Sequence, residues 1–337
     1  MRSINVLWLG PPALPALLGK KGAEGIATVY NHRGTDLALS VIHPHRYPEK
    51  LAPLLVGLGM CDGAVLVVEA LDATLGERLV ALDLAQIRNG VLLIADYLDE
   101  SKLDRALQGT VVASYARRSV PTLVSEGPDA ALASSLRDEL LAFPPPRTEA
   151  GAPTMVHVDE HFPVKGVGTV ALGVVRGAPV QVHQQLQAFP GTVLATVRSI
   201  QVHDEDVKEA PVGSRVGLAL KDITTEQLDR GVVLAPPTTM RTTTSLTVPV
   251  HVTPFYRKGL RTGQVIHLAV GLQVKPATIG ALQDGGGSSV PALGAGAKGT
   301  IALSLEQPLV FRAGERALVC DIDAAPPRVA AAIQLTG

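Results

Sequence analysis

The sequence predicts a domain of alternating strands and helices followed by two smaller β-barrels. The chain has 337 residues, of which 46% are apolar and 18% charged, and this composition excludes general disorder. Up to residue 143, buried apolar runs alternate with helical segments, which is typical of a parallel sheet covered by helices. After residue 153, short β-rich runs follow one another closely with Gly and Pro between them, which is typical of small closed barrels.

Apolar runs bounded by turn residues predict the strands of the first domain, each buried on both faces. These runs are residues 5–9, 63–68, 90–95 and 121–124. The segments predicted to be helical are residues 47–59, 74–88 and 129–143. Thr74 and Glu77 have the spacing of a capping box, which would satisfy free N–H groups at the start of the second helix.

Three consecutive prolines at 144–146 end the helical pattern, and residues 147–153 are predicted to form an exposed linker. The β-rich runs beyond it fall into two groups. The first group is 169–175, 193–202, 215–220 and 232–234, and the second is 245–253, 265–274, 299–305 and 317–322. The glycines at 285–287 predict a hairpin tip. The predicted domains are therefore residues 1–146, 154–238 and 242–337.

The net charge of −1 excludes a chain that is basic along its whole length. This value is the sum over three blocks of the chain whose net charges differ in sign. Residues 241–337 carry 9 basic and 5 acidic side chains, a net +4, whereas residues 1–151 carry a net −3 (14 and 17) and residues 152–240 a net −2 (7 and 9). A solvated surface and an RNA-facing patch both explain a basic last block.

Cysteine usage and hydropathy indicate a cytoplasmic protein without a membrane anchor. Cys61 and Cys320 are the only cysteines, so a disulfide framework or a four-cysteine zinc site is excluded and two buried thiols are expected. The apolar stretch near the N-terminus is interrupted by Pro11, Pro12 and Pro15, which argues against a signal peptide. No run reaches the length of a membrane span.

The second block resembles the second domain of elongation factor Tu-type translational GTPases. The matching residues are VDEHFPVKGVGTV at 158–170, Gly173, RSIQVH at 198–203, APVGSRVGL at 210–218 and RG at 230–231. They are most similar to the selenocysteine-specific, SelB-type branch and its short archaeal members. The third block resembles that family's third domain in strand spacing and in Gly259 and Gly263. The resemblance implies that the first domain has the P-loop GTPase fold.

The phosphate-binding loop that the family requires is not preserved. Such a loop needs G-x-x-x-x-G-K-[ST] after the first strand, so that N–H groups and a lysine hold phosphates and a hydroxyl binds Mg²⁺. Gly10 begins the loop, but Pro15 stands at the second Gly, Ala16 at the Lys and Leu17 at the hydroxyl position. Prolines also lack an N–H donor. We therefore expect no cofactor, and GTP with Mg²⁺ only if an altered loop binds it.

The other GTPase elements are altered too. At the D-x-P-G-H element, His43 stands at the metal-side Asp, Arg46 at the Gly and Tyr47 at the water-positioning His. At N-K-x-D, Leu98 stands at the guanine-binding Asp, although a one-residue shift would place Asp99 there. Residues 125–127, Ser-Glu-Gly, stand at the last element. The resemblance therefore implies a pseudo-GTPase, with the fold retained and the hydrolytic site lost.

His43 and His45 share one side of a strand end, which is a spacing that metal ligands can have. No third ligand is identifiable in the sequence, so no metal is expected. These two histidines with Tyr47 and Asp62 could instead form a catalytic pocket at the carboxyl edge of the sheet. An ordinary polar sheet edge accounts for the same residues.

The resemblance also implies a pocket for the aminoacyl end of tRNA on the second domain. Asp159 and Arg215 match the family's acid and arginine, whereas Glu160 replaces a second cation. One cation with two acids would not hold an anionic selenolate, so selenocysteine specificity is not expected. An exposed Asp159–Arg215 ion pair is the structural alternative, with a contribution under about 1 kcal/mol.

The sequence thus predicts a SelB-like elongation factor homologue, monomeric and cytoplasmic, that binds tRNA and the ribosome through its barrels without GTP binding or hydrolysis. A protein-interaction scaffold outside translation is one alternative. A weak GTP-binding protein with an altered loop is another.

Overall fold

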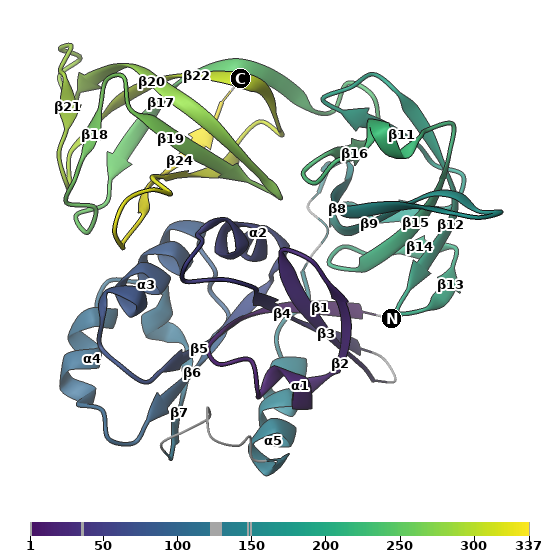
Figure 1. Ribbon diagram of the computed structural model, residues 1–337, viewed down its shortest axis with the longest axis horizontal. Coiled ribbons are helices and arrows are strands. Elements are labelled where there is room, and N and C mark those ends of the chain that lie inside the picture. The colour runs from purple at the N-terminus through teal and green to yellow at the C-terminus, as the bar shows by residue number, and fades with distance from the viewer. Residues whose placement is uncertain (1, 35–36, 122–129, 147, 149, 337) are drawn as a thin grey trace. The chain divides into compact units, whose positions relative to one another are not determined.

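The computed structural model describes residues 2–34, 37–121, 130–146, 148 and 150–336, and it contains an α/β domain followed by two barrels (Figure 1). The strands of the α/β domain are β1 (Arg2–Leu9), β2 (Lys20–Glu24), β3 (Ala27–Arg33), β4 (Leu37–Pro44), β5 (Gly63–Val68), β6 (Gly90–Ala95) and β7 (Ala116–Val120). Its helices are α1 (Pro15–Leu18), α2 (Ala52–Met60), α3 (Ala73–Ala85), α4 (Glu100–Leu107) and α5 (Ala130–Leu141), with the 3₁₀ turn η1 (Val111–Ser114).

The strands of this domain form one sheet in the order β2-β3-β4-β1-β5-β6-β7. β1 runs parallel to β4, and β6 runs parallel to β7, as the alternating pattern predicts. β2, β3 and β4 form an antiparallel edge. Every residue of β5 and β6 is buried, because helices cover both faces of a parallel sheet.

The predicted strands 5–9, 63–68 and 90–95 are confirmed, whereas the strand predicted at 121–124 is wrong. Its place is taken by β7, which ends at Val120, and residues 122–129 lie outside the described part of the chain. β7 was missed because four of its five residues, Ala-Arg-Arg-Ser, are polar or small and are not buried. The sequence pattern also missed β2, β3, β4, α1 and α4.

Helix α3 begins with a different cap from the predicted one. The Asp72 side chain accepts a hydrogen bond from the Leu75 backbone N at 2.8 Å, so Asp72 is the N-cap and the Thr74–Glu77 capping box is not formed. Glu77 is fully buried and binds Arg328 instead. Helix α2 begins five residues later than predicted. Helical conformation is disfavoured at a residue that precedes a proline, here Tyr47 before Pro48.

The barrel of the second domain, here named the second barrel, is an antiparallel sheet closed by the pairing of β11 with β12. Its strands are β8 (Thr154–Val164), β9 (Gly168–Gly177), β10 (Val180–Gln181), β11 (Gln185–Phe189), β12 (Leu194–Val202), β13 (Glu205–Val207), β14 (Glu209–Ala210), β15 (Arg215–Lys221) and β16 (Val233–Ala235), with the 3₁₀ turn η2 (Thr225–Gln227). Val, Leu, Ile and Ala side chains fill its interior, and the four predicted strands are confirmed.

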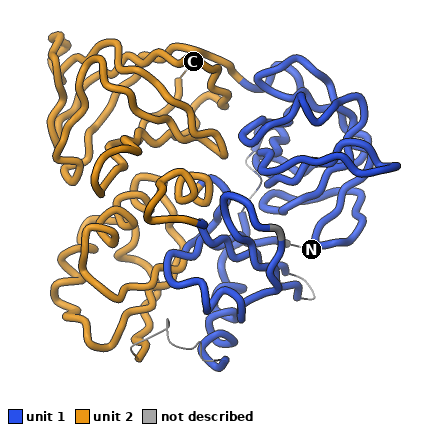
Figure 2. Tube along the Cα trace, viewed as in Figure 1, with its two compact units in different colours: residues 1–45, 59–64, 123–240 blue, residues 46–58, 65–122, 241–337 orange. Residues whose placement is uncertain are grey.

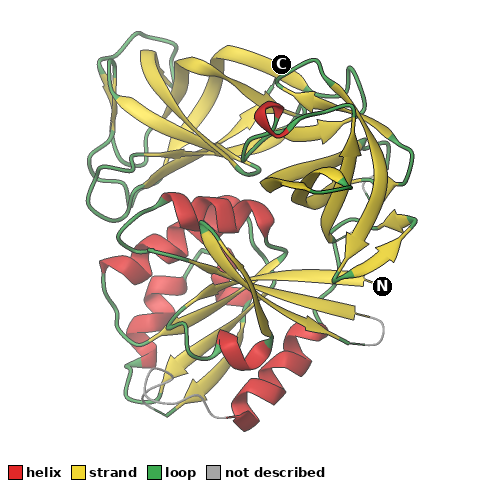
Figure 3. Cartoon of the chain, turned by 45° about the vertical axis from the view of Figure 1, so that its right-hand side comes forward, coloured by secondary structure: helices red, strands yellow, loops and turns green. Residues whose placement is uncertain are grey.

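The barrel of the third domain, here named the third barrel, is closed in the order β17-β22-β20-β19-β23-β24. Its strands are β17 (Arg241–Val252), β18 (Leu260–Arg261), β19 (Val265–Val270), β20 (Gln273–Asp284), β21 (Ala292–Leu293), β22 (Lys298–Phe311), β23 (Glu315–Cys320) and β24 (Val329–Leu335). The run predicted at 265–274 is divided into β19 and β20 by a turn at Gly271. Among the described residues, all helices of α type belong to the α/β domain (Figure 3).

The chain divides into two compact units (Figure 2). Unit 1 comprises residues 1–45, 59–64 and 123–240, and unit 2 comprises residues 46–58, 65–122 and 241–337. Each barrel therefore groups with one part of the α/β domain. Cys61 and Cys320 are buried free thiols, as predicted. None of the described helices combines the length and the hydropathy needed to cross a membrane.

Candidate functional site

The loop between β1 and α1 (residues 10–14) lies where the sequence predicts the remnant of a phosphate-binding loop. Gly10 follows β1, and Pro15 is buried at the start of α1. Leu14 and Leu18 are fully buried, whereas Ala16 is exposed and Leu17 is 38% exposed. Apolar side chains therefore fix this loop to the core. Helix α1 has only four residues, so it cannot supply the long helix with a strong N-terminal dipole that phosphate sites use.

Side chains of the same unit donate hydrogen bonds to backbone carbonyl groups of the loop and of helix α1. The indole Nε1 of Trp8 donates to the Pro11 carbonyl at 2.8 Å. Arg137 of α5 donates to the carbonyls of Leu17 and Leu18, the latter at 3.2 Å. Carbonyl groups of the loop and of α1 are thus hydrogen-bonded to protein side chains. The prolines of this segment also lack the N–H groups that would bind an anion.

His43 and Tyr47 lie at and just after the end of β4. His43 is half-buried and pairs with Thr28 across the sheet, whereas His45 is exposed. The Arg78 guanidinium lies 5.6 Å from the centre of the Tyr47 ring, and burial raises the pKa of the Tyr47 hydroxyl well above its ordinary value. Tyr47 therefore stays protonated at neutral pH. Within the described ranges, no three His, Cys, Asp or Glu side chains are grouped as metal ligands would be.

Leu98 and Asp99 lie between β6 and α4, where the guanine-reading element is predicted. Leu98 is half-buried, and Asp99 is the N-cap of α4. The Asp99 carboxylate accepts hydrogen bonds from the Ser101 hydroxyl at 2.6 Å and backbone N at 3.0 Å, and these bonds help to lower its pKa. A one-residue shift therefore places a capping residue at the base-reading position. Residues 125–127 lie outside the described residues.

Asp159 and Arg215 are brought together on the second barrel. A β-bulge in β8 between Val158 and Glu160 leaves Asp159 unpaired in the ladder, so its side chain turns toward β15. The side chain of Asp159 is 9% exposed, and its Oδ2 lies 3.4 Å from an Arg215 guanidinium nitrogen. The predicted pair is therefore formed, and it is buried rather than at the surface.

Arg230 completes this cluster, so the predicted count of a single cation is wrong. Its Nε lies 3.2 Å from Asp159 Oδ1, and another guanidinium nitrogen lies 3.9 Å from Glu160 Oε1. Two guanidinium groups therefore face two carboxylates, and the four charges sum to zero. The Arg-Gly pair at 230–231 was part of the family pattern, but the 71 residues that separate Arg230 from Asp159 in sequence concealed the contact.

A cleft of about 890 Å³ in unit 1 opens beside this cluster. Lys20, Lys21 and Arg33 of the β2–β3 edge line it together with Asp159, Glu160 and Arg215 of the barrel. His203, in the turn after β12, also lines it, and its Nε2 has no hydrogen-bond partner among the described residues. Burial, with Arg215 and Arg33 nearby, lowers the pKa of His203, so its imidazole is neutral at pH 7.

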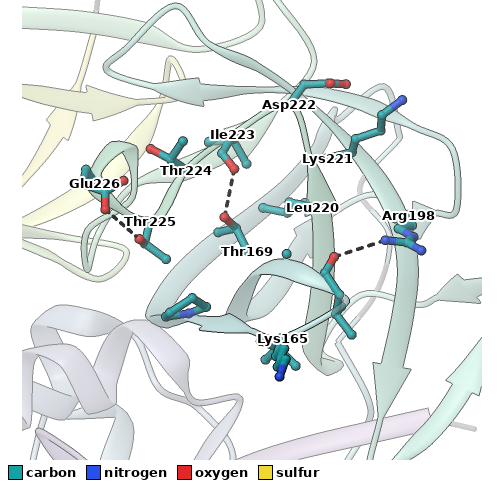
Figure 4. A pocket seen from close by; sticks show the side chains of 14 residues that line it. Lys165, Thr169, Arg198, Leu220, Lys221, Asp222, Ile223, Thr224, Thr225 and Glu226 are labelled. Carbon is teal, nitrogen blue, oxygen red and sulfur yellow. Dashed lines mark hydrogen bonds between the residues drawn. The ribbon is translucent and has the colours of Figure 1, made fainter.

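A second cleft of about 820 Å³ lies on the second barrel alone (Figure 4). Arg198 of β12 and Lys221 of the adjacent β15 extend from neighbouring strands, and Lys165 lies on the β8–β9 turn. Arg198 donates to the Val167 carbonyl at 3.3 Å, and the Thr169 hydroxyl donates to Ile223 O at 2.9 Å. Lys165, Arg198 and Lys221 thus line this cleft together with two acidic side chains, Asp222 and Glu226.

The chain is similar to archaeal proteins along most of its length. An uncharacterized protein of Methanocaldococcus jannaschii is 31% identical over 91% of this chain and 90% of its own length. The selenocysteine-specific elongation factor of the same organism is 28% identical over 66% of this chain, which spans 50% of that factor. No protein-family model matches the chain.

The solved structures agree on the fold. The crystal structure of translation elongation factor SelB from Methanococcus maripaludis in its apo form has a TM-score of 0.78, with 22% identity, and it covers 100% of this chain and 80% of that one. The α/β domain followed by two antiparallel barrels therefore has the same architecture as that solved elongation factor. The chain belongs to the same family as the uncharacterized M. jannaschii protein, and in sequence and fold it is similar to SelB-like factors of the elongation factor Tu type.

Proposed function

We propose that this protein is a SelB-like factor that binds the aminoacyl end of tRNA through its second barrel and has lost GTP binding and hydrolysis. The observation that carries the first part is the cluster of Asp159, Glu160, Arg215 and Arg230 beside a cleft of about 890 Å³. The cluster supplies hydrogen-bond donors and acceptors without net charge. It suits a neutral aminoacyl ester better than an anionic side chain.

The loss of nucleotide chemistry is supported by the loop between β1 and α1. A phosphate cradle needs free N–H groups, a lysine and a hydroxyl. Here Pro15, Ala16 and Leu17 stand at those positions, and Leu14, the last residue of the loop, is fully buried. The nearest lysines, Lys20 and Lys21, belong to β2 and line the cleft beside the second barrel instead.

Contact with RNA phosphates is supported by the cations of the second barrel's own cleft and by the charge of the third barrel. In the cleft shown in Figure 4, the three cations Lys165, Arg198 and Lys221 outnumber the two acids that also line it. Residues 241–337 carry a net charge of +4. Basic side chains on a concave surface release counterions when they meet a phosphate backbone. The ribosome and tRNA are therefore the proposed partners.

Titration calorimetry with GTP and Mg²⁺ tests the nucleotide part directly. We expect no heat of binding up to about 1 mM GTP, which corresponds to an affinity weaker than about −4 kcal/mol. Binding tighter than this would favour the alternative of a GTP-binding protein with an altered loop. The same titration with GDP shows whether any nucleotide affinity requires the third phosphate.

Filter binding with aminoacylated and deacylated tRNA tests the RNA part. We expect binding at low salt that weakens at moderate salt, and a preference for the aminoacylated form that Arg215→Gln removes. The exposed Lys102 of α4 provides a matched control, since Lys102→Gln removes one cation far in sequence from the barrel. Absence of affinity at low salt would contradict the proposal and favour a protein-interaction scaffold outside translation.

A further inference from the structure

The short segments that precede and follow helix α2 each accept hydrogen bonds from an arginine of a barrel. Residues 48–49 precede the helix, and their carbonyls face Arg328, which leads into β24 of the third barrel. Residues 60–62 comprise the last residue of the helix and the two residues before β5, and they face Arg176 of β9 in the second barrel. Each set of contacts lies within one compact unit.

The Arg328 contacts are buried and directional. Glu77 of α3 is 0% exposed and Arg328 is 5% exposed. The guanidinium binds the carboxylate through two nitrogens, at 2.8 Å to Oε2 and 2.6 Å to Oε1, and the Arg328 backbone N adds a third bond at 2.8 Å. The nitrogen that binds Oε1 also donates to the Pro48 carbonyl at 2.9 Å. One side chain thus joins the third barrel, helix α3 and the segment before α2.

The Arg176 contacts have the same design in the other unit. One guanidinium nitrogen lies 3.0 Å from Asp62 Oδ1, and another donates to the Met60 carbonyl at 2.6 Å. The second oxygen of Asp62 accepts the backbone N and the side-chain amide of Asn5, both at 2.9 Å. That amide also donates to the Gly213 carbonyl of the second barrel at 2.7 Å. A carboxylate and a carbonyl are again held by one barrel arginine.

We propose that Arg176 and Arg328 form two clasps that hold helix α2 in place without a bound nucleotide. If the segment before α2 moved, the buried Arg328 guanidinium would lose its carbonyl partners. If the segment after α2 moved, Arg176 would lose the Met60 carbonyl and the Asp62 carboxylate would lose its arginine. GTP-controlled switches instead order such segments through contacts to the γ-phosphate and Mg²⁺. The clasps consist of side chains of this chain, so the inference does not depend on the proposed function.

Hydrogen–deuterium exchange of the full chain tests the clasps. In Glu77→Gln and in Arg176→Gln, we expect the amides of α2 (Ala52–Met60) to exchange at least tenfold faster than in the unmodified protein. Amides of β6 (Gly90–Ala95) should change less than about twofold. Asp104→Asn is the matched control, because it breaks the exposed Arg117–Asp104 ion pair and should leave α2 unchanged.

Two results would overturn the clasps. One is α2 exchange in both variants equal to that in Asp104→Asn. The other is an equal acceleration in β6, because the residues would then support the whole fold rather than α2. If Glu77→Gln fails to fold, Arg328→Lys decides the matter. A lysine keeps the charge but lacks the planar set of donors, so faster exchange is expected around residues 48–52. Unchanged exchange in that variant would contradict the proposal.

A separate measurement with GTP distinguishes failure of the clasp proposal from failure of the proposed function. GTP and Mg²⁺ at about 1 mM are added to the unmodified protein, and α2 exchange is expected to stay the same. A change in α2 on adding GTP would contradict both the nucleotide independence of the clasps and the proposed loss of GTP binding. A null result with GTP combined with unaffected α2 in the variants would overturn the clasps alone.

Discussion

Asp159 is the point where the polar side chains of the second barrel converge. It accepts from Arg215 and Arg230, and its own side chain is 9% exposed. A carboxylate between two guanidinium groups neutralises charges that would otherwise repel each other at close range. The sequence located Asp159, Glu160 and Arg215 through the family resemblance. It matched Arg230 to the same family but did not place it at the site, since only folding brings the loop before β16 to the bulge in β8.

The first prediction concerns this carboxylate. Asp159→Asn leaves two guanidinium groups with a weaker acceptor, so we expect the free energy of unfolding to fall by about 2 kcal/mol in urea denaturation. Asp206→Asn, on the exposed strand β13, is the control and should change it by less than about 0.5 kcal/mol. Equal effects of the two substitutions would mean that Asp159 is an ordinary surface acid.

The second prediction concerns His157, which is fully buried in β8. Burial, with Arg176 nearby, lowers its pKa from 6.5 to about 4. Above pH 6.5 the imidazole is neutral in both states and contributes no pH dependence. Between pH 6.5 and 4 only the unfolded chain binds the proton, so stability decreases as the pH falls, by about 3 kcal/mol in total.

Urea denaturation at several pH values between 7.5 and 4 checks this slope. His157→Leu should flatten the part of the profile below pH 6.5, because an apolar side chain of similar size does not titrate. His251→Gln, at an exposed position of β17, should leave the profile as it is. Identical profiles for the unmodified protein and His157→Leu would assign the acid sensitivity to other groups.

At the scale of the element, the sequence predicted those strands and helices whose own pattern determines them. β5 and β6 were found with correct bounds because every residue in them is buried and apolar. β7 was misplaced because its residues are mostly exposed, so its position depends on pairing with β6 rather than on its pattern. The capping box of α3 failed because Glu77 gains more from Arg328, a residue 251 positions away, than from the helix terminus.

The glycine of the APVGS segment illustrates a tertiary constraint at an element boundary. Gly213 has a φ of +87° just before β15, and a Cβ there would lie 2.2 Å from Pro146 Cγ. Its carbonyl accepts from Asn5. A side chain is therefore excluded both by backbone conformation and by the close approach of the α/β domain within unit 1.

The third prediction separates these two effects. Gly213→Ala should lower the free energy of unfolding by about 1 kcal/mol for the left-handed backbone and a further 1–3 kcal/mol for overpacking. Gly263→Ala has a similar φ of +82° but no atom near the added Cβ, so it should show only the backbone cost. Thermal or urea unfolding measures both. A loss in Gly213→Ala no greater than in Gly263→Ala would show that Pro146 yields easily.

At the scale of the whole molecule, the sequence predicted the order of an α/β domain and two barrels. This was possible because the spacing of the predicted strands and the positions of the glycines are visible along the sequence itself. It could not predict which residues of different domains meet. Arg176–Asp62 and Arg328–Glu77 are 114 and 251 residues apart, and no local pattern marks either pair.

The fourth prediction follows from the distribution of charge. Residues 241–337 carry a net +4, so we expect the third barrel to provide phosphate contacts for tRNA. Arg241→Gln combined with Lys298→Gln, both at exposed positions, should weaken binding for all tRNA species alike. It should also reduce the slope of log K against log salt concentration by about 2.

A control with the same loss of charge, Lys50→Gln with Arg105→Gln in the α/β domain, should leave that slope unchanged. If both double variants reduced the slope equally, net charge rather than the third barrel would determine the affinity. Filter binding across a series of salt concentrations distinguishes the two outcomes.

Trp8 gives the molecule an internal reporter. It is the only tryptophan in the chain, it is 0% exposed, and its indole nitrogen binds the Pro11 carbonyl in the loop after β1. Indole fluorescence depends on the polarity and hydrogen bonding around the ring. Any ligand that rearranged residues 10–14 would therefore change the emission of a single fluorophore, while the barrels would contribute nothing to the tryptophan signal. The loop at residues 10–14, where the family binds phosphate, can thus be observed by fluorescence without an added label.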